Sequence, residues 1–341
     1  MCNCVYLKIV LLLISLHAKS EVNQFGIPAL PISVDPIQQR MAFIVGPRDG
    51  QSSPKTDSCQ VYVLDLSNHR TEKILENESV FWFCWRNNGK NPELWISVQY
   101  EVLGFWPRYK LVVISFRDNT IDVESKKIVK NADIVGFLKW NQDGSILTGQ
   151  PKKDYSVFGG GVFKGRIAIS LSDGKNSRVY SKNNVNPSAL YWITENTFFV
   201  QDLDRTSIIE FCVTQNDLLL NDIPYTADKI VLCGVIKNLP VYRRDGDIYW
   251  GDDLFYDSNG KVGWIRVSDS YMAFIDNSAI VVVDTTGKEI ARKRVEKSGL
   301  IDISPLAKTV YFLSGIEKIQ SWNFEKNSPI ETLFDVKTIA E

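Results

Sequence analysis

The chain has 341 residues, with 39 basic and 40 acidic side chains and no long block of either charge. This balance gives no electrostatic attraction for nucleic acid or for an anionic membrane surface, so we expect neither nucleic-acid binding nor membrane insertion. Aromatic residues make up 11% of the chain. Val, Ile, Tyr, Phe and Thr dominate the apolar segments, a composition typical of β-strands.

Residues 1–20 have the three parts of a secretory signal peptide. Lys8 precedes an unbroken apolar run over residues 9–16, and a small-residue cleavage site ends at Ser20. The run is too short to cross a bilayer as a helix. Removing Lys8 and Lys19 leaves 37 basic against 40 acidic residues, a net charge of −3. We therefore expect a secreted or periplasmic protein, cleaved near Ser20.

Seven similar segments follow along residues 21–341. Each has the apolar end of one strand, a short polar turn and an apolar strand of about five residues. They begin at Ile32, Trp85, Trp140, Trp192, Tyr242, Trp264 and Ile301. Asp and Asn bond their own backbone in turns and Gly accepts positive φ, so each segment predicts a β-hairpin. A second predicted hairpin follows each first one, which gives four antiparallel strands per unit.

Repeated four-stranded units predict an all-β fold, a β-propeller of four-stranded antiparallel blades. The first five hairpins begin 50 to 55 residues apart, but Tyr242 and Trp264 are separated by only 22. Seven blades fit the number of strands, which we favour, and six fit the spacing. We expect one propeller domain over residues 21–341, after the signal peptide of residues 1–20.

The pattern resembles the WD40-like and TolB-like propeller repeats, whose hairpins carry a degenerate W-x-P-D-G-x-x-L or S-P-D-G-x-x-I signal. The matching segments are "WNQDGSILTG" from Trp140 and, in part, "ISPLAKTVYFLSG" from Ile303. The Gly-His and Trp-Asp dipeptides of true WD40 blades are absent. The resemblance implies the propeller fold and assigns no functional residue.

Signals for catalysis and for metal binding are missing. His69 is the only histidine after residue 20, so a multi-histidine metal site cannot form. If "WNQDG" were a calcium loop, Lys139 and Gln150 would occupy positions that need acidic ligands. In "FGGGVFKGR", Arg166 and Ile167 stand where a phosphate loop needs Lys and Ser or Thr. We therefore predict no cofactor, no metal site and no assigned catalytic residue.

Paired carboxylates leave one enzymatic alternative open. Asp202 and Asp204, like Asp252 and Asp253, follow predicted second strands. Glycosidases work with two carboxyl groups that flank the scissile bond. The alternative function is therefore a carbohydrate-active enzyme, a glycosidase or lyase, with carboxylates in the propeller channel.

Four cysteines follow the signal peptide: Cys59, Cys84, Cys212 and Cys233. In an oxidising compartment an even number of cysteines indicates disulfides. Proximity in sequence predicts bonds from Cys59 to Cys84 and from Cys212 to Cys233. The alternative is four free thiols, because "WFCW" and "EFCV" have the pattern of strand interiors.

Long connections between second and third strands predict a binding face opposite the short turns. These loops span residues 46–58, 101–108 and 150–165, and loops of such length are often functional. In or beside them lie Arg48, Trp106, Arg108, Tyr109, Lys153 and Tyr155. Trp, Tyr and Arg dominate binding hot spots. We therefore predict an exported, monomeric, noncatalytic binding module that recognises a protein or peptide partner, although Trp106 could instead pack over a blade edge.

Overall fold

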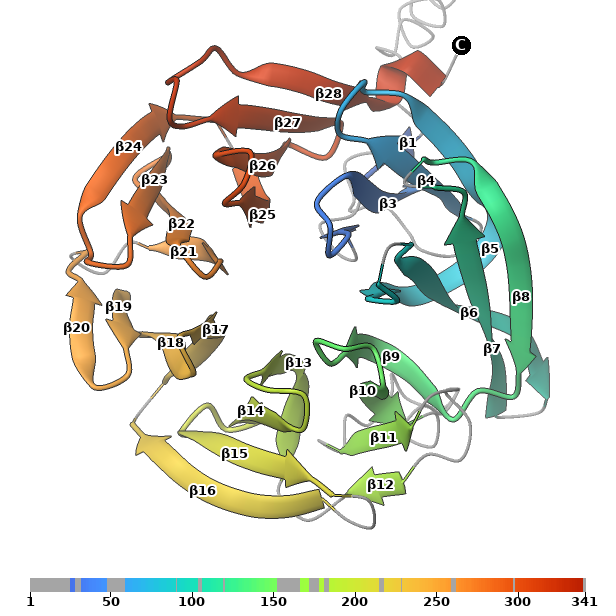
Figure 1. Ribbon diagram of the computed structural model, residues 1–341, viewed down its shortest axis with the longest axis horizontal. Helices are drawn as coiled ribbons and strands as arrows, with labels where there is room; N and C mark the ends of the chain where they lie inside the picture. Colours follow the sequence, from blue (N-terminus) through green and yellow to red (C-terminus); the bar gives the residue numbers. More distant parts are fainter. Residues whose placement is uncertain are drawn as a thin grey trace, which may run out of the picture.

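The computed structural model describes residues 25–27, 32–47, 59–89, 91–103, 106–118, 120–151, 166–171, 178–180, 184–214, 218–227, 229–258, 262–296 and 298–339. These ranges form antiparallel β-sheets and one short 3-10 helix, η2 (Val336–Ile339). The sheets follow one another around a ring in chain order (Figure 1). The architecture is therefore a β-propeller, as the sequence predicts.

Five separate sheets in this ring have four strands each. In chain order their strands are β9 (Ile134–Trp140), β10 (Ile146–Pro151), β11 (Ile167–Leu171) and β12 (Arg178–Tyr180); β13 (Val185–Trp192), β14 (Thr197–Asp202), β15 (Ser207–Val213) and β16 (Leu218–Thr226); β17 (Val231–Ile236), β18 (Leu239–Arg244), β19 (Asp247–Trp250) and β20 (Asp253–Tyr256); β21 (Gly263–Val267), β22 (Tyr271–Asp276), β23 (Ala279–Asp284) and β24 (Glu289–Arg294); β25 (Ser298–Ser304), β26 (Thr309–Ser314), β27 (Lys318–Asn323) and β28 (Glu331–Asp335).

The N-terminal part of the ring is one continuous eight-stranded sheet. It contains β1 (Phe25–Gly26), β2 (Ile32–Val34), β3 (Arg40–Pro47), β4 (Cys59–Asp65), β5 (Thr71–Arg86), β6 (Glu93–Leu103), β7 (Trp106–Phe116) and β8 (Val123–Lys130).

The long strand β5 joins two groups of strands within this sheet. Residues 71–78 pair with β4 and residues 79–86 pair with β6. Just before the change of partner, Asn77 adopts a left-handed conformation with φ of 56°, which turns the strand without a loop. The structure therefore has five separate four-stranded sheets and one eight-stranded sheet. Neither the predicted seven blades nor the alternative of six agrees with this number of sheets.

Most predicted hairpins join the expected strands, but one unit is displaced. The segment from Tyr242 connects β18 to β19, the second and third strands, and not the first and second. The preceding hairpin, β17 to β18, turns at Lys237 and Asn238, both with positive φ. Because this turn contains neither Gly nor Pro, the sequence pattern did not reveal it. As a result, the next stretch with a hairpin pattern, "DLFYDSNGKVGWI", contains β20 and part of β21, which belong to two different sheets.

The hydrophobic cores lie between neighbouring sheets, and one of them closes the ring. Ile27 and Phe43 from the N-terminal sheet pack with Tyr311 and Phe334 from the last sheet. The Ile27 amide also donates a hydrogen bond of 2.7 Å to the carbonyl of Ile316. Ile27 therefore links the first and last sheets.

The first strand of each four-stranded sheet lies innermost in the ring, as β9, β13, β17, β21 and β25 show (Figure 1). Strands β13, β17, β21, β25 and β2 contact one another in that order. Each innermost strand ends at a short turn to the second strand. The C-terminal parts of the innermost strands are therefore close to the short-turn face.

Candidate functional site

A cavity of about 350 Å³ lies between the innermost strands β2, β13, β17, β21 and β25. We call it the central cavity. Its polar and aromatic lining residues are Ser33, Tyr191, Trp192, Cys233, Arg266 and Asp302. They lie in the middle or the C-terminal part of their strands. The central cavity is therefore closer to the short-turn face than to the predicted long-loop face.

β-Bulges shape the wall of the central cavity. The pairing of β17, β21 and β25 with their second strands skips one residue each: Cys233, Trp264 and Ile301. A bulge leaves the extra residue outside the ladder and re-aims its neighbours, which is common next to functional sites. Cys233 and Ile301 line the cavity directly. The bulges thus place backbone and side-chain polar groups at the centre of the ring.

Arg266 is held rigidly at the cavity wall by backbone carbonyls. Its Nε donates to the carbonyl of Ile301 at 2.7 Å, and its Nη1 donates to the carbonyl of Ile265 at 3.0 Å. Within the described part of the chain, the guanidinium forms no ion pair, although it lies half-buried. Its Nη2 remains an available donor, so the fixed positive charge can receive an anionic group.

Asp302 brings a carboxyl group to the same cavity from the neighbouring strand β25. Its Oδ1 accepts a hydrogen bond of 2.8 Å from the Ile303 amide. Burial raises the pKa of Asp302 to about 6, against the lowering effects of this bond and of the Arg266 charge. Asp302 therefore changes its charge close to neutral pH and can accept a further hydrogen bond.

Lys139, on β9, is a second basic group close to the central cavity, and it lies beside the cavity residue Tyr191. Its Nζ donates to the carbonyls of Ser188 and Leu190 and lies 4.3 Å from the centre of the Tyr191 ring. Burial, and next the repulsion from Arg266, lower the pKa of Lys139 to about 7. Because the charge of Arg266 contributes to the lowered pKa of Lys139, both basic groups contribute positive charge to the same central region.

The thiols near the cavity are protonated at neutral pH. Burial raises the pKa of Cys233 to about 11, and burial also raises the pKa of Cys84, which lies on β5 near Lys139. The thiolate is the nucleophilic form of cysteine. These two side chains are therefore weak nucleophiles at neutral pH.

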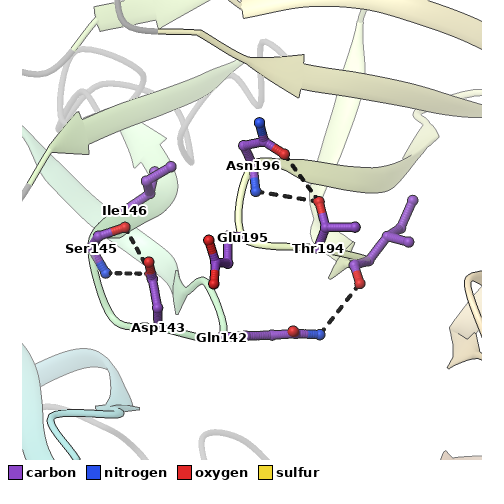
Figure 2. A pocket seen from close by; sticks show the side chains of 8 residues that line it. Gln142, Asp143, Ser145, Ile146, Thr194, Glu195 and Asn196 are labelled. Carbon is purple, nitrogen blue, oxygen red and sulfur yellow. Dashed lines mark hydrogen bonds between the residues drawn. The ribbon is translucent and has the colours of Figure 1, made fainter.

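A second hollow, of about 530 Å³, lies on the short-turn face between the β9–β10 and β13–β14 turns (Figure 2). Asp143 and Glu195 line it. Asp143 accepts hydrogen bonds from the Ser145 amide at 2.9 Å and from its hydroxyl at 2.7 Å. Burial acts to raise the pKa of Asp143, but these bonds outweigh it and lower the pKa overall. A carboxylate held ionised by its own turn is a poor general acid.

The two predicted carboxylate pairs, Asp202 with Asp204 and Asp252 with Asp253, do not line the central cavity. Asp202 ends β14, where its oxygens accept hydrogen bonds from Thr206 and Ser207 in the next turn. Asp252 is exposed and follows β19, a third strand and not a second one as predicted. Asp302 is the one carboxyl group that the described residues place in the central cavity.

The structure locates only part of the predicted long-loop site. Arg48, Lys153 and Tyr155 lie outside the described residues. Trp106 begins β7, where its backbone pairs with Leu103, and Arg108 is exposed on the same strand. Tyr109 was predicted to contact a partner, but it is buried, and its ring packs edge-on against Phe81 with 5.6 Å between the ring centres. Since it faces inward from the extended strand, Tyr109 cannot contact a partner directly.

The predicted disulfides are wrong. Cys59, Cys84, Cys212 and Cys233, on strands β4, β5, β15 and β17, form no disulfide bond. The alternative of strand-interior thiols agrees with these positions. The described ranges contain no group of three or more His, Cys, Asp or Glu side chains that could hold a metal ion. Among the same residues, no helix is long and apolar enough to cross a membrane.

Sequence reasoning missed the central cavity, although a weak signal exists. Each of three apolar first strands contains one charged residue near its end: Lys139 in "FLKW", Arg266 in "WIRV" and Asp302 in "LIDI". In each strand an apolar residue follows the charged one directly. Alternation along a strand turns such a residue away from the neighbour that packs in the core. Aligning the repeats at this position would have brought the three charges together.

Comparison with known proteins supports the fold alone. No protein-family model matches the sequence, and no curated protein gives a significant match. Among solved structures, an acylaminoacyl peptidase from Pyrococcus horikoshii aligns with a TM-score of 0.60 at 11% identity, over 93% of this chain and 53% of the peptidase. This chain therefore spans about half the length of that enzyme.

Two further solved structures resemble the chain at a similar level. An uncharacterized protein from Listeria monocytogenes aligns with a TM-score of 0.55 at 11% identity, covering 94% of this chain and 97% of that protein. A post-proline cleaving enzyme from Rickettsia typhi aligns with a TM-score of 0.50 at 8% identity, covering 88% of this chain and 53% of that enzyme. At identities this low, the likeness shows a shared propeller architecture and says nothing about activity.

Proposed function

We propose that this protein is an exported, noncatalytic binding module that recognises a protein or peptide partner at the centre of its propeller. The observation that carries the proposal is the central cavity, where Arg266 and Asp302 lie on neighbouring strands without forming an ion pair with each other. A peptide supplies both a hydrogen-bond acceptor for the guanidinium and N–H donors for the carboxyl group. The signal-peptide pattern of residues 1–20 supports export.

The charges of the central cavity favour binding over hydrolysis. Glycosidases need two cooperating carboxyl groups, whereas Asp302 is the one carboxyl group that lines this cavity within the described ranges. The solved structures that resemble this chain include an acylaminoacyl peptidase and a post-proline cleaving enzyme, but the match covers only 53% of each. A binding role therefore requires only groups that the described residues place in the central cavity.

Blocking the cavity tests this function. The probe is a nonapeptide library with free termini, retained on immobilised protein and quantified by mass spectrometry. Ser33→Trp places an indole in the cavity, while Glu124→Trp adds the same side chain to the exposed outer strand β8. We expect the Ser33 variant to lose at least nine-tenths of the retained peptide and the Glu124 variant to match the wild type.

The same assay compares the cavity with the long-loop face. Arg108→Ala changes the exposed arginine near the predicted loop 101–108 and should leave retention unchanged if the cavity is the site. Thermal unfolding of each variant separates lost binding from lost folding. If Arg108→Ala abolishes retention while Ser33→Trp does not, the partner binds at the long-loop face and the cavity assignment is wrong.

A further inference from the structure

We propose that the central cavity binds the C-terminal carboxylate of a peptide, with Arg266 holding the carboxylate and Trp264 packing against an apolar side chain near that terminus. This inference rests on the proposed function and specifies its ligand. A fixed cation and an acceptor for a peptide N–H line the cavity, and an exposed aromatic ring, Trp264, lies beside the cation; all three are on the neighbouring strands β21 and β25.

The orientation of Arg266 is set before any ligand binds. Two carbonyls, of Ile301 and Ile265, use its Nε and Nη1. The Ile301 carbonyl belongs to the residue that the β25 bulge leaves without a cross-strand partner. A guanidinium held in this way keeps Nη2 available as a donor at the cavity wall and loses little conformational entropy when it binds a carboxylate.

Asp302 distinguishes a peptide terminus from a simple anion. Its carboxyl group lines the same cavity, and the described residues provide one donor to it, the Ile303 amide at 2.8 Å. Sulfate would bring only negative charge near Asp302, and inorganic phosphate would add only its P–OH donors and no backbone N–H group. A peptide terminus combines its carboxylate with backbone N–H groups, so it can bond to Arg266 and Asp302 together.

Lys139 makes the central region favourable for negative charge. It lies beside Tyr191, which lines the cavity, and its Nζ is held by the carbonyls of Ser188 and Leu190. Together with Arg266 it gives two basic groups around one carboxyl group, Asp302. Because the Lys139 Nζ already donates to two carbonyls, Lys139 would act on a bound carboxylate only through its charge at a distance. Arg266 would contact the carboxylate directly.

Trp264 provides an apolar surface next to Arg266. It is the bulged residue of β21, it has a φ of 45°, and it remains 43% exposed. The Arg266 guanidinium carbon lies 6.0 Å from the centre of the indole. A tryptophan in a left-handed conformation is a steric outlier of the kind that clusters at functional sites. Its exposed ring can pack against the side chain next to a bound carboxylate.

The size of the cavity fits the end of a chain. Its volume of about 350 Å³ is at the lower end of the range for ligand pockets. A volume of this size suits a small ligand or the end of a chain better than a folded surface. Recognition would therefore depend on the last residues of a partner and on its free carboxyl group.

Two matched peptide libraries test the inference. Both contain random nonapeptides with free amino termini; one has free C-terminal carboxylates and the other has C-terminal amides. We expect wild-type protein to retain the free-acid library at least tenfold more strongly than the amidated one. Arg266→Gln should bring this ratio close to one, Arg266→Lys should keep part of it, and Arg292→Gln, on the outer strand β24, should leave it unchanged.

The selected sequences test Trp264 separately. Free-acid peptides retained by the wild type should be enriched in apolar residues near the C-terminus. Trp264→Ala should remove this enrichment, while Leu254→Ala, which deletes an exposed apolar side chain on the outer strand β20, should not. Circular dichroism and thermal unfolding confirm that each variant is folded before its retention is interpreted.

The outcomes separate this inference from the proposed function. Equal retention of the acid and amide libraries would overturn the C-terminal inference and leave peptide binding intact. Retention of neither library by folded wild type would contradict both. Displacement of the free-acid peptides by an equal concentration of inorganic phosphate would show a general anion site, which also overturns the inference.

Discussion

The Nε of Arg266 donates a hydrogen bond of 2.7 Å to the carbonyl of Ile301, across the boundary between two sheets of the propeller. The acceptor is available because a bulge removes Ile301 from the pairing of β25 with β26. The bulge in the last sheet therefore orients the charged side chain of Arg266 in the neighbouring sheet. The same bulge precedes Asp302, which places opposite charges in one cavity without an ion pair between them.

Replacing Asp302 by Asn should stabilise the protein more at pH 7.5 than at pH 4. The pKa of Asp302 is raised to about 6, so the folded state binds its proton more tightly than the unfolded chain. The stability from this proton is complete below about pH 4 and is lost as the pH rises through about 6. Relative to wild type, Asp302→Asn should gain about 1–3 kcal/mol between these pH values, since one pKa unit corresponds to about 1.4 kcal/mol.

Urea unfolding at the two pH values measures this change. Asp284→Asn is the matched control, because hydrogen bonds from Thr286 lower the pKa of the half-buried Asp284. Its effect should have the opposite sign: the variant loses stability relative to wild type as the pH rises from 2.5 to 5. A constant difference between Asp302→Asn and wild type at all pH values would contradict the burial of the Asp302 charge.

Binding of a free-acid peptide should strengthen as the pH falls from 8 to 5.5. Lys139, with its pKa lowered to about 7, gains a proton over this range, and Asp302, with its pKa raised to about 6, loses its negative charge. Both changes make the cavity more positive, while a peptide carboxylate stays ionised. We expect the Kd measured by calorimetry to fall about tenfold, or about 1.4 kcal/mol.

The amidated form of the same peptide is the control, and its Kd should change less over this pH range. Lys139→Gln should remove the part of the pH dependence near pH 7, and Asp302→Asn should remove the part near pH 6. Weaker binding of the free-acid peptide at pH 5.5 than at pH 8 would be incompatible with a cationic subsite.

Gly144→Ala should destabilise the fold much more than Gly89→Ala. Both glycines have positive φ, 72° and 71°, so both substitutions strain the backbone by about 1–2 kcal/mol. A Cβ on Gly144 would also lie 2.1 Å from the carbonyl oxygen of Asn87, whereas Gly89 has open space around it. We expect a loss of about 1 kcal/mol for Gly89→Ala and about 3 kcal/mol for Gly144→Ala in urea unfolding.

This pair of variants also tests the role of the "WNQDGSILTG" turn. Gly144 lies where the turn meets the neighbouring turn at Asn87, and the Arg86 Nε donates to its carbonyl at 2.8 Å. Equal losses for the two glycine variants would mean that the two turns are not in close contact.

Asp35→Asn should cause one of the largest losses of stability among single charge changes. The Asp35 carboxylate accepts from the Arg40 Nε at 2.8 Å, and both side chains are fully buried. Arg40 also packs over the rings of Trp85 and Phe116. Removing one partner leaves a buried charge uncompensated, which costs about 3–5 kcal/mol.

Glu289→Gln is the control for this prediction, because it removes one partner of the exposed Glu289–Arg292 pair at 2.8 Å. Exposed pairs contribute about 0–1 kcal/mol, so the midpoint of thermal unfolding should move little. Similar shifts for Asp35→Asn and Glu289→Gln would show that Arg40 finds another partner or reaches solvent.

The repeat of apolar strands and polar turns was sufficient to predict the propeller and most hairpins, because alternation and turn chemistry are local properties. The blade count was not predictable from the same pattern. It depends on the residue in β5 at which the chain changes partner, and Asn77 makes this change without a loop. The displaced hairpin has the same origin, since Lys237 and Asn238 form a turn without Gly or Pro.

The site was harder to predict than the fold because it is assembled from distant strands. Lys139, Arg266 and Asp302 are far apart in sequence, and bulges at Cys233, Trp264 and Ile301 set their surroundings. The strongest local signals, long loops with aromatic and basic residues, pointed to the opposite face. There, Tyr109 proved to be buried, because its place in the alternation of β7 turns it toward the core.

A crystal structure of the protein with the tightest-binding free-acid nonapeptide tests the central claim most directly. We predict that the peptide carboxylate lies in the central cavity within about 3 Å of the Arg266 Nη2, a charge-assisted hydrogen bond, with an apolar side chain against Trp264. A peptide bound at the long-loop face, or a central cavity filled only by solvent in a complex that binds peptide in solution, would contradict it.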